Sequence, residues 1–470
     1  MDDISRPRSV PDPTLLLFLM AGTLVCALLV ADPTARIALV CLGLLPMGIW
    51  LFRLLATVPA AGTALLVVAA AVPRGAVDIG GLNVRPEHVA VALLCLALPL
   101  LMKRRLSENV AWVFADYLLA VYVGLNILSS LVMSPDPPQT LKWSMQQTLA
   151  ILPYFFLRVL VNDEQKLRWA FRAFLVVGTL AAAYGLTAYY SNLFFGTSFG
   201  VDVEQYGTLP ATYGSQYEAN VLGAYCGAYS VAMLAMYLQE KRRIYLVGYG
   251  ITLAGMTISL SRGALGATVI GLLVLAYCAR RMGLLHWRAI RSITLATACM
   301  ALVILPVLAQ QYAERLSTID VADPSADENT ALRLVQIMTA VDDILQSPVM
   351  GNGTASFQLF TRGTTTASGE APAWIANSEL RILHDTGVVG FLAFVLFLGS
   401  LVRQSRKRLK RVSDPILRAL LVSMVVYCIS FQATEGTMLA FTWVHLGLIG
   451  CALGLAKAAN GKLSATEHFS

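Results

Sequence analysis

The sequence contains few charged residues, and this shortage determines its class. Asp, Glu, Lys and Arg make up 13% of the 470 residues, whereas 57% are hydrophobic. Mean hydropathy is +0.66, and apolar runs repeatedly reach the roughly 20 residues that cross a bilayer core. Lipid cannot satisfy backbone N–H and C=O groups, so such runs must be helices. The alternating pattern of a membrane β-barrel is absent. The sequence therefore predicts an all-α polytopic membrane protein.

The sequence also lacks paired cysteines. All eight cysteines lie in apolar runs, and no two have CxxC spacing. Neither a disulfide framework nor a metal site is predicted, and packing is the favoured role of these side chains. The formal charge of +7 does not require a nucleic-acid partner, because Lys and Arg of membrane proteins collect on cytoplasmic loops.

Hydropathy predicts about fourteen membrane spans, or about twelve if the two shortest runs are left out. The first run lacks a small-residue cleavage site, so it is predicted to be a retained helix. The predicted spans are 14–31, 37–55, 59–73, 88–102, 110–132, 144–161, 168–190, 218–238, 244–260, 263–279, 289–309, 387–402, 416–433 and 437–456.

A polar stretch divides these spans into three regions. They are an N-terminal bundle at 1–309, a loop at 310–386 and a C-terminal bundle at 387–470. Placing both termini in the cytoplasm puts most of the 35 Lys and Arg residues inside, as orientation of membrane proteins requires. The loop then lies outside, which is the periplasm if the protein is Gram-negative.

The loop contains one amphipathic segment. Apolar residues recur at helical spacing after Asn329, which can cap a helix that runs to about Gln346. Ser347 and Pro348 end the pattern. We expect this helix to lie on the membrane surface or to close over a cavity as a lid.

Ionisable residues near membrane depth are expensive and are functional candidates. Arg262 stands between two predicted spans with almost no loop, where a guanidinium can bind a phosphate or diphosphate. The alternative is an arginine that reaches the membrane interface. Arg333, on the loop helix, is by itself more typical of a solvated charge. Arg362 and Arg381 are further outside cations that can serve the same anion.

Three carboxylates and two histidines complete the candidates. Glu218, with Asn220, opens a span at its outer end; it is either a base for an acceptor hydroxyl or a charge that complements the helix dipole. His384 is either a base or, more often at such a position, structural. Asp116, His445 and the loop residue Glu435 favour buried hydrogen bonds between helices.

Three stretches form an ordered pattern around the long loop. They are Thr257 to Ala264, then Leu332 to Leu334 with Pro348 to Gly353 and Phe357, then Asn377 to Gly390. This pattern resembles the O-antigen ligase and O-antigen polymerase superfamily of bacterial envelope glycosyltransferases. The resemblance covers Glu218 to Phe397.

The resemblance implies a GT-C-like fold in the bacterial inner membrane, with the active site facing the periplasm. Arg262 and Arg333 match the two family arginines that hold the diphosphate of an undecaprenyl-linked oligosaccharide. It also implies inverting glycosyl transfer to a sugar hydroxyl, without cofactor or metal. Glu218 and then His384 are the choices for acceptor activation, and Asn220, Arg362, Asn377 and Arg381 for substrate binding.

One departure from the family favours a polymerase. Ligases usually carry a histidine before the asparagine that matches Asn377, and this sequence has Ala376. His384, eight residues later, cannot replace it by register. We therefore expect a polymerase of lipid-linked repeat units for an exopolysaccharide, capsule or O-antigen, with a growing polysaccharide as acceptor and with a chain-length regulator as a further possible partner. A ligase acting on lipid A core or protein is the alternative in the same class.

Two alternatives belong to other classes. A flippase or other transporter of lipid-linked oligosaccharides would need charges along a route through the bundle. A transporter built from two similar halves would more often show an internal repeat, and the sequence shows none. A non-catalytic assembly partner would tolerate loss of the arginines.

Overall fold

The computed structural model describes residues 54–55, 57–79, 82–103, 110–202, 211–317, 328–360 and 374–467. The predicted span at 14–31, most of the one at 37–55, and Arg362 lie outside these residues.

Helices dominate the described chain. Two short antiparallel hairpins pair Val77 with Val84 and Val201 with Thr212. The elements in chain order are α3 (Pro59–Ala70), β1 (Val77–Ile79), β2 (Leu82–Val84), α4 (Pro86–Lys103), α5 (Phe114–Val132), α6 (Pro137–Leu160), α7 (Glu164–Phe195), β3 (Val201–Asp202), β4 (Ala211–Thr212), α8 (Ala219–Glu240), α9 (Arg243–Ile258), α10 (Arg262–Arg281), α11 (Trp287–Ser317), α12 (Glu328–Gln346), α13 (Phe357–Phe360), α14 (Ser378–Arg411), α15 (Pro415–Ser430) and α16 (Ala440–Glu467).

Six described helices are long and apolar enough to cross a membrane, namely α5, α7, α8, α10, α14 and α16. Four shorter apolar helices, α3, α4, α9 and α15, occupy further predicted spans. The predicted class, an all-α multi-pass membrane protein, is confirmed. The total number of spans and their orientation stay predictions.

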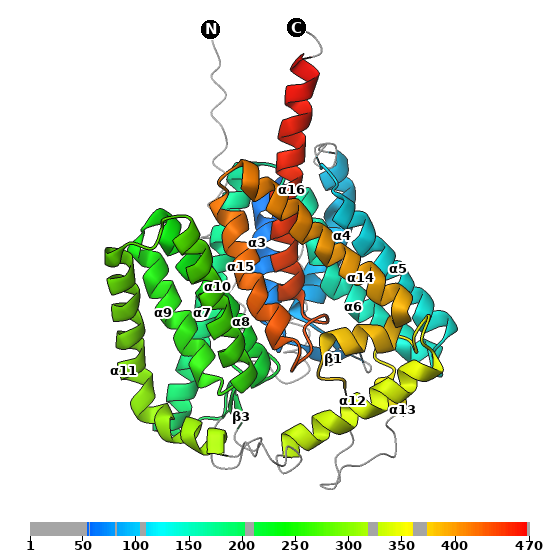
Figure 1. Ribbon diagram of the computed structural model, residues 1–470. Coiled ribbons are helices and arrows are strands. Elements are labelled where there is room, and N and C mark those ends of the chain that lie inside the picture. The colour runs from blue at the N-terminus through cyan, green and yellow to red at the C-terminus, as the bar shows by residue number, and fades with distance from the viewer. Residues whose placement is uncertain are drawn as a thin grey trace, which may run out of the picture.

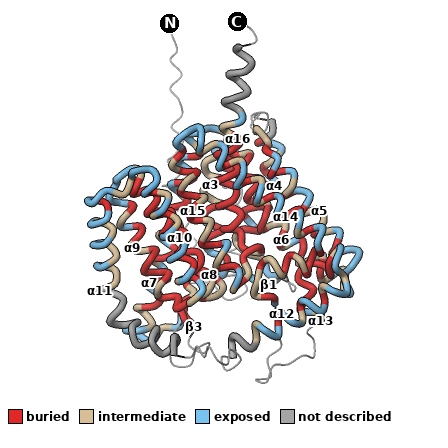
Figure 2. The backbone as a smooth tube through the Cα atoms, viewed as in Figure 1, coloured by how far each residue is buried: buried red, intermediate tan, exposed pale blue. Residues whose placement is uncertain are grey.

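Helix α8 forms the centre of the bundle, packed against α9, α10 and α15. Every residue in the apolar stretch of α8 is buried. Small residues on α8 allow this close approach: Gly223 lies against Ser259 and Ser261, and Gly227 against Thr268 of α10. Helices α7, α9, α10 and α11 lie on one side of this centre, and α4, α5, α6 and α14 on the other (Figure 1). Buried residues concentrate where the groups meet (Figure 2).

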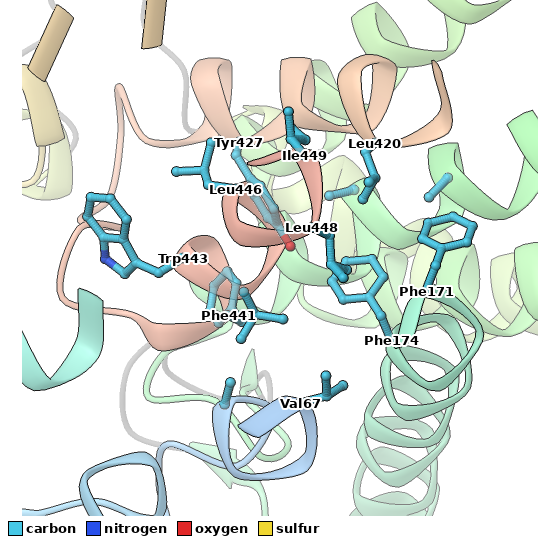
Figure 3. Packing of buried hydrophobic residues seen from close by; sticks show 14 of the residues in the cluster. Val67, Phe171, Phe174, Leu420, Tyr427, Phe441, Trp443, Leu446, Leu448 and Ile449 are labelled. Atoms are coloured by element: carbon cyan, nitrogen blue, oxygen red, sulfur yellow. The ribbon is translucent and has the colours of Figure 1, made fainter. Parts of the chain in front are cut away.

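Aromatic side chains fill the middle of the bundle. Phe174 of α7 stacks on Tyr229 of α8 with ring centroids 4.3 Å apart. Phe441 and Trp443 of α16 are both buried. Figure 3 shows these α16 rings with Phe171 and Phe174, packed in one cluster. Each such ring buries a large apolar area, so this cluster holds α7, α8 and α16 together.

Two ionisable residues inside the bundle, Asp116 and His445, make contacts between helices, as predicted. Asp116 of α5 accepts from Arg158 Nη2 of α6 at 3.0 Å and from Tyr154 Oη at 2.6 Å. His445 Nε2 of α16 lies 2.8 Å from the Leu420 carbonyl oxygen of α15. These contacts join α5 to α6 and α15 to α16.

Helix α12 lies across one end of the bundle, whereas the C-terminal part of α16 projects from the opposite end (Figure 1). We call the first of these the α12 end. The helix predicted from Asn329 to about Gln346 is confirmed, with its start at Glu328.

The predicted loop, 310–386, includes helical residues at both of its ends. Helix α11 continues to Ser317, and α14 already begins at Ser378. Hydropathy detects where the chain becomes polar, and a helix continues beyond that point when its residues still favour helix.

Helix α14 is kinked at Gly387, where φ is 62° and ψ is −170°. Beyond the kink, the N–H of Val388 donates to the carbonyl of Pro348 at 2.9 Å, and that of Val389 to Val349 at 3.2 Å. The turn that follows α12 thereby satisfies amides that the kink leaves without helical partners. This turn joins the C-terminal end of α12 firmly to α14.

Candidate functional site

Five segments converge at the α12 end. They are α12, the first turns of α14, the α15–α16 link (residues 431–439), the start of α8, and the turn between α9 and α10. The predicted site residues within the described chain come from four of these segments, and the link supplies the residues that hold two of them.

Arg381 joins α14 to the α15–α16 link. Its Nη1 lies 3.1 Å from Glu435 Oε2, and its Nε lies 3.4 Å from Asp385 Oδ2. Only 9% of the arginine side chain is exposed. Because two carboxylates neutralise this cation, the geometry favours a bridging role over the predicted binding of a substrate anion.

Glu435 is held by its own segment. One carboxylate oxygen accepts from the backbone N–H of Thr437 at 2.6 Å and of Met438 at 3.3 Å, and also from the Thr437 hydroxyl. The other oxygen faces Arg381. The carboxylate therefore has a fixed orientation.

His384 is fully buried within α14. Its Nδ1 lies 3.0 Å from Asp385 Oδ1, and its Nε2 lies 3.4 Å from Asp343 Oδ2 on α12. A base must reach a substrate hydroxyl, and a fully buried ring between two carboxylates does not. The arrangement favours the structural role, in which His384 ties α12 to α14.

Asn377 caps α14. Its Oδ1 accepts from the N–H of Leu380 at 2.8 Å, and its Nδ2 donates to the carbonyl of Gln432 at 3.2 Å. An asparagine followed two positions later by Glu379 is typical of a helix start, so the sequence contained this signal. The geometry favours capping over the predicted substrate contact.

Ala376 is also connected to α12. Its backbone N–H donates to Gln336 Oε1 at 3.3 Å. Gln336 is buried on α12. Position 376 thus joins the segment before α14 to α12 through the backbone.

Glu218 is the N-cap residue of α8, and its side chain makes no capping hydrogen bond. Burial raises the pKa of Glu218 above its ordinary value, the charge of Glu435 acts in the same direction, and the charge of Arg333 opposes both. Arg333 belongs to α12 and Glu435 to the link, so two other segments of this end contribute to the electrostatic environment of Glu218. Asn220 follows in the first turn of α8.

Arg262 is the first residue of α10, after a tight turn in which Leu260 has φ 53°. Ser261 caps the helix by accepting from the N–H of Ala264 at 3.3 Å. The turn packs on Gly223, just over one helical turn after Glu218, and a Cβ at Gly263 would lie 3.6 Å from Cβ of Ala433 in the link. Arg262 therefore stands beside the segments that carry Glu218 and Glu435, and it is partly exposed.

A second polar group at this end was not predicted. Arg85 Nη1 donates to the carbonyl of Met438 at 2.7 Å, and its guanidinium carbon lies 4.9 Å from the centre of the Tyr217 ring. Glu87 is fully buried, 3.6 Å from Arg85. These charges stand at the start of a predicted span. They are ionisable residues near membrane depth, as Glu218 is, so the sequence contained a signal for them too.

Within the described chain, no three His, Cys, Asp or Glu side chains gather in a geometry that could hold a metal ion. No family model matches this sequence, and no curated protein matches it significantly.

Proposed function

We propose that this protein polymerises lipid-linked polysaccharide repeat units at the α12 end of its bundle. The observation that carries the proposal is the convergence of three segments: α12, which carries Arg333, is held at this end through Gln336 and Asp343, and the Arg262 turn packs on the helix that Glu218 begins. Two arginines and a carboxylate at one membrane boundary suit a lipid diphosphate donor and a hydroxyl acceptor.

In the proposed reaction, an acceptor hydroxyl attacks the anomeric carbon of the donor sugar from the face opposite the diphosphate. A C–O bond forms, the bond to the diphosphate breaks, and undecaprenyl diphosphate leaves. Arg262 and Arg333 stabilise the charge that develops on the leaving group. Glu218, as a carboxylate, receives the hydroxyl proton.

The choice of polymerase over ligase rests on Ala376. Its methyl side chain has no group that can take part in proton transfer, and its N–H is used to hold α12. A repeat unit then serves as donor and as acceptor. We place the reaction at the periplasmic face of a bacterial inner membrane, where a chain-length regulator would act with it.

A transporter of lipid-linked glycans is supported less well. It would need charged groups along a route through the bundle. In the described chain, the predicted site residues gather at the α12 end, and the interior charges Asp116 and Arg158 neutralise each other.

The test replaces Arg262 and Arg333 separately by alanine and analyses glycan chain length in cells. Loss of long polymer, with single repeat units persisting on the lipid carrier, is expected, because removal of one transition-state cation lowers rates by about 10²-fold or more. Arg168→Ala is the matched control, since Arg168 is an exposed residue that pairs with Glu164 on the same helix.

Each competing function predicts a different product. A ligase variant would leave full-length polymer on the lipid carrier, and a flippase variant would trap repeat units on the inner side. Unchanged chain length in both variants, with normal membrane insertion, would exclude the proposed polymerase.

A further inference from the structure

Helix α12 presents polar side chains inward. Gln336, Ala340 and Asp343 recur at helical spacing and are buried against the bundle. Their contacts hold the helix: Gln336 accepts from the N–H of Ala376, and Asp343 lies 3.4 Å from His384. Arg333, three residues before Gln336, shares this inward face.

The opposite side of α12 is apolar and exposed. Met338 is 68% exposed and Leu345 is 71% exposed. We call this surface the apolar stripe; its residues are Leu334, Ile337, Met338, Val341 and Leu345. A water-soluble amphipathic helix buries its apolar face and exposes its polar face. Helix α12 does the reverse, so its exposed face requires an apolar partner.

The apolar stripe continues onto the membrane bundle. The turn after α12 exposes Val349, which is joined by a backbone hydrogen bond to Val389 of α14. Val388, Val389 and Leu392 are exposed on this helix, which is long and apolar enough to span a membrane. The exposed side chains of such a helix face acyl chains. The same lipid is therefore the nearest partner of the apolar stripe.

A third side of α12 combines exposed polar residues with the exposed Val335. Asp342 and Gln346 are exposed, and about 100° of rotation separates Asp342 from its neighbour Val341. An apolar side next to a polar exposed edge is typical of a helix that lies in the membrane interface, with one side in acyl chains and one in water.

We infer that α12 is an interfacial helix whose apolar stripe is embedded in the phospholipid leaflet at the α12 end. The leaflet holds the helix from outside while Asp343 and Gln336 hold it from the bundle side. If the proposed function is correct, this position keeps Arg333 at the depth of lipid headgroups, where the diphosphate of a lipid-linked donor lies. The membrane contact itself does not depend on that function.

The test uses the full chain in nanodiscs of phosphatidylethanolamine and phosphatidylglycerol, with a diazirine amino acid placed at 341 or at 342. These consecutive positions lie at nearly the same point along the helix axis, but they are on different faces of the helix. On illumination, the diazirine at 341 should form a covalent adduct with phospholipid. The yield of this adduct should fall to background when the diazirine is at 342. Mass spectrometry of the intact chain reads the adduct.

A background yield at 341, equal to that at 342, overturns the inference. The same labelling in intact cells tests a protein partner, because a protein adduct at 341 in place of phospholipid also overturns it.

Val341→Asp separates the membrane contact from the proposed function. It should abolish lipid labelling from a diazirine at 338 and shorten the glycan, and Val341→Leu should change neither. Loss of lipid labelling with unchanged polymer in Val341→Asp would retain the membrane contact of the parent chain and remove its role in positioning Arg333. Absence of any polymer dependence on Arg262 or Arg333 would instead remove the proposed function.

Discussion

The guanidinium of Arg381 lies 3.1 Å from the carboxylate of Glu435, and this contact joins α14 to the α15–α16 link. The pair is buried, and Asp385 adds a second carboxylate on the same arginine. The candidate site therefore lies beside a cluster of paired charges, and Asp385 of this cluster also contacts His384, which faces Asp343 of α12.

Arg381→Ala should destabilise the protein strongly. The change leaves Glu435 and Asp385 without their cation, and removal of one partner of a buried pair costs about 3–5 kcal/mol. Thermal unfolding in detergent measures the effect. Arg168→Ala, at an exposed pair, should cost at most about 1 kcal/mol. Equal unfolding temperatures for the two variants would contradict the bridging role of Arg381.

His384→Gln should lower polymerisation without changing the shape of its pH profile. Glutamine can keep one of the two links to Asp343 and Asp385, so α12 is held less firmly but no catalytic proton is lost. The measurement is the rate of polymer formation against pH in membrane vesicles. A pH dependence that disappears in this variant would show that His384 transfers a proton.

Polymerisation should rise with pH as Glu218 loses its proton. Burial raises the pKa of Glu218, so the carboxylate form that accepts a proton is lost below that raised pKa, and the inflection should lie above the ordinary glutamate value. The raised pKa of Glu218 has the opposite effect on the stability of the fold, which should fall as pH rises. The folded state holds the proton more tightly than the unfolded chain, so this contribution to stability is present at low pH and is lost as pH rises through the folded pKa.

Glu218→Gln tests both statements. It should lower the rate and remove this inflection, while the loss of stability with rising pH becomes smaller. An unchanged inflection in the variant would assign the pH dependence to another group.

Gly387→Ala and Gly399→Ala should have opposite effects within one helix. At Gly387, φ is 62° and an added Cβ would press on the Val349 carbonyl, so we expect destabilisation by about 2 kcal/mol or more. At Gly399 nothing lies within 4 Å of an added Cβ, and alanine should stabilise the helix interior by about 0.5–1 kcal/mol. Thermal unfolding of the two variants provides the comparison.

The sequence predicts features that depend on local pattern. The apolar runs identify the fold class, and the spacing after Asn329 identifies α12, because each depends on residues within one segment. The same logic found Asp116 and His445, since an ionisable residue inside an apolar run must have a partner.

Features that depend on distant partners were not predictable. Arg381, His384 and Asn377 are paired with Glu435, Asp343 and Gln432, and no local pattern connects these positions. Viewed singly, an outside arginine or histidine resembles a substrate-binding group. The fold shows instead that these three side chains have protein partners.

The kink at Gly387 has a consequence for how the site receives its substrate. The turn after α12 supplies the carbonyls that complete α14 beyond the kink, so lifting the C-terminal end of α12 would break the hydrogen bonds at the start of a membrane helix. The C-terminal end of α12 is thus fixed to α14 and does not act as a movable lid. If the proposed function is correct, fixed charges of this kind would present the same electrostatic environment to a growing glycan in each cycle.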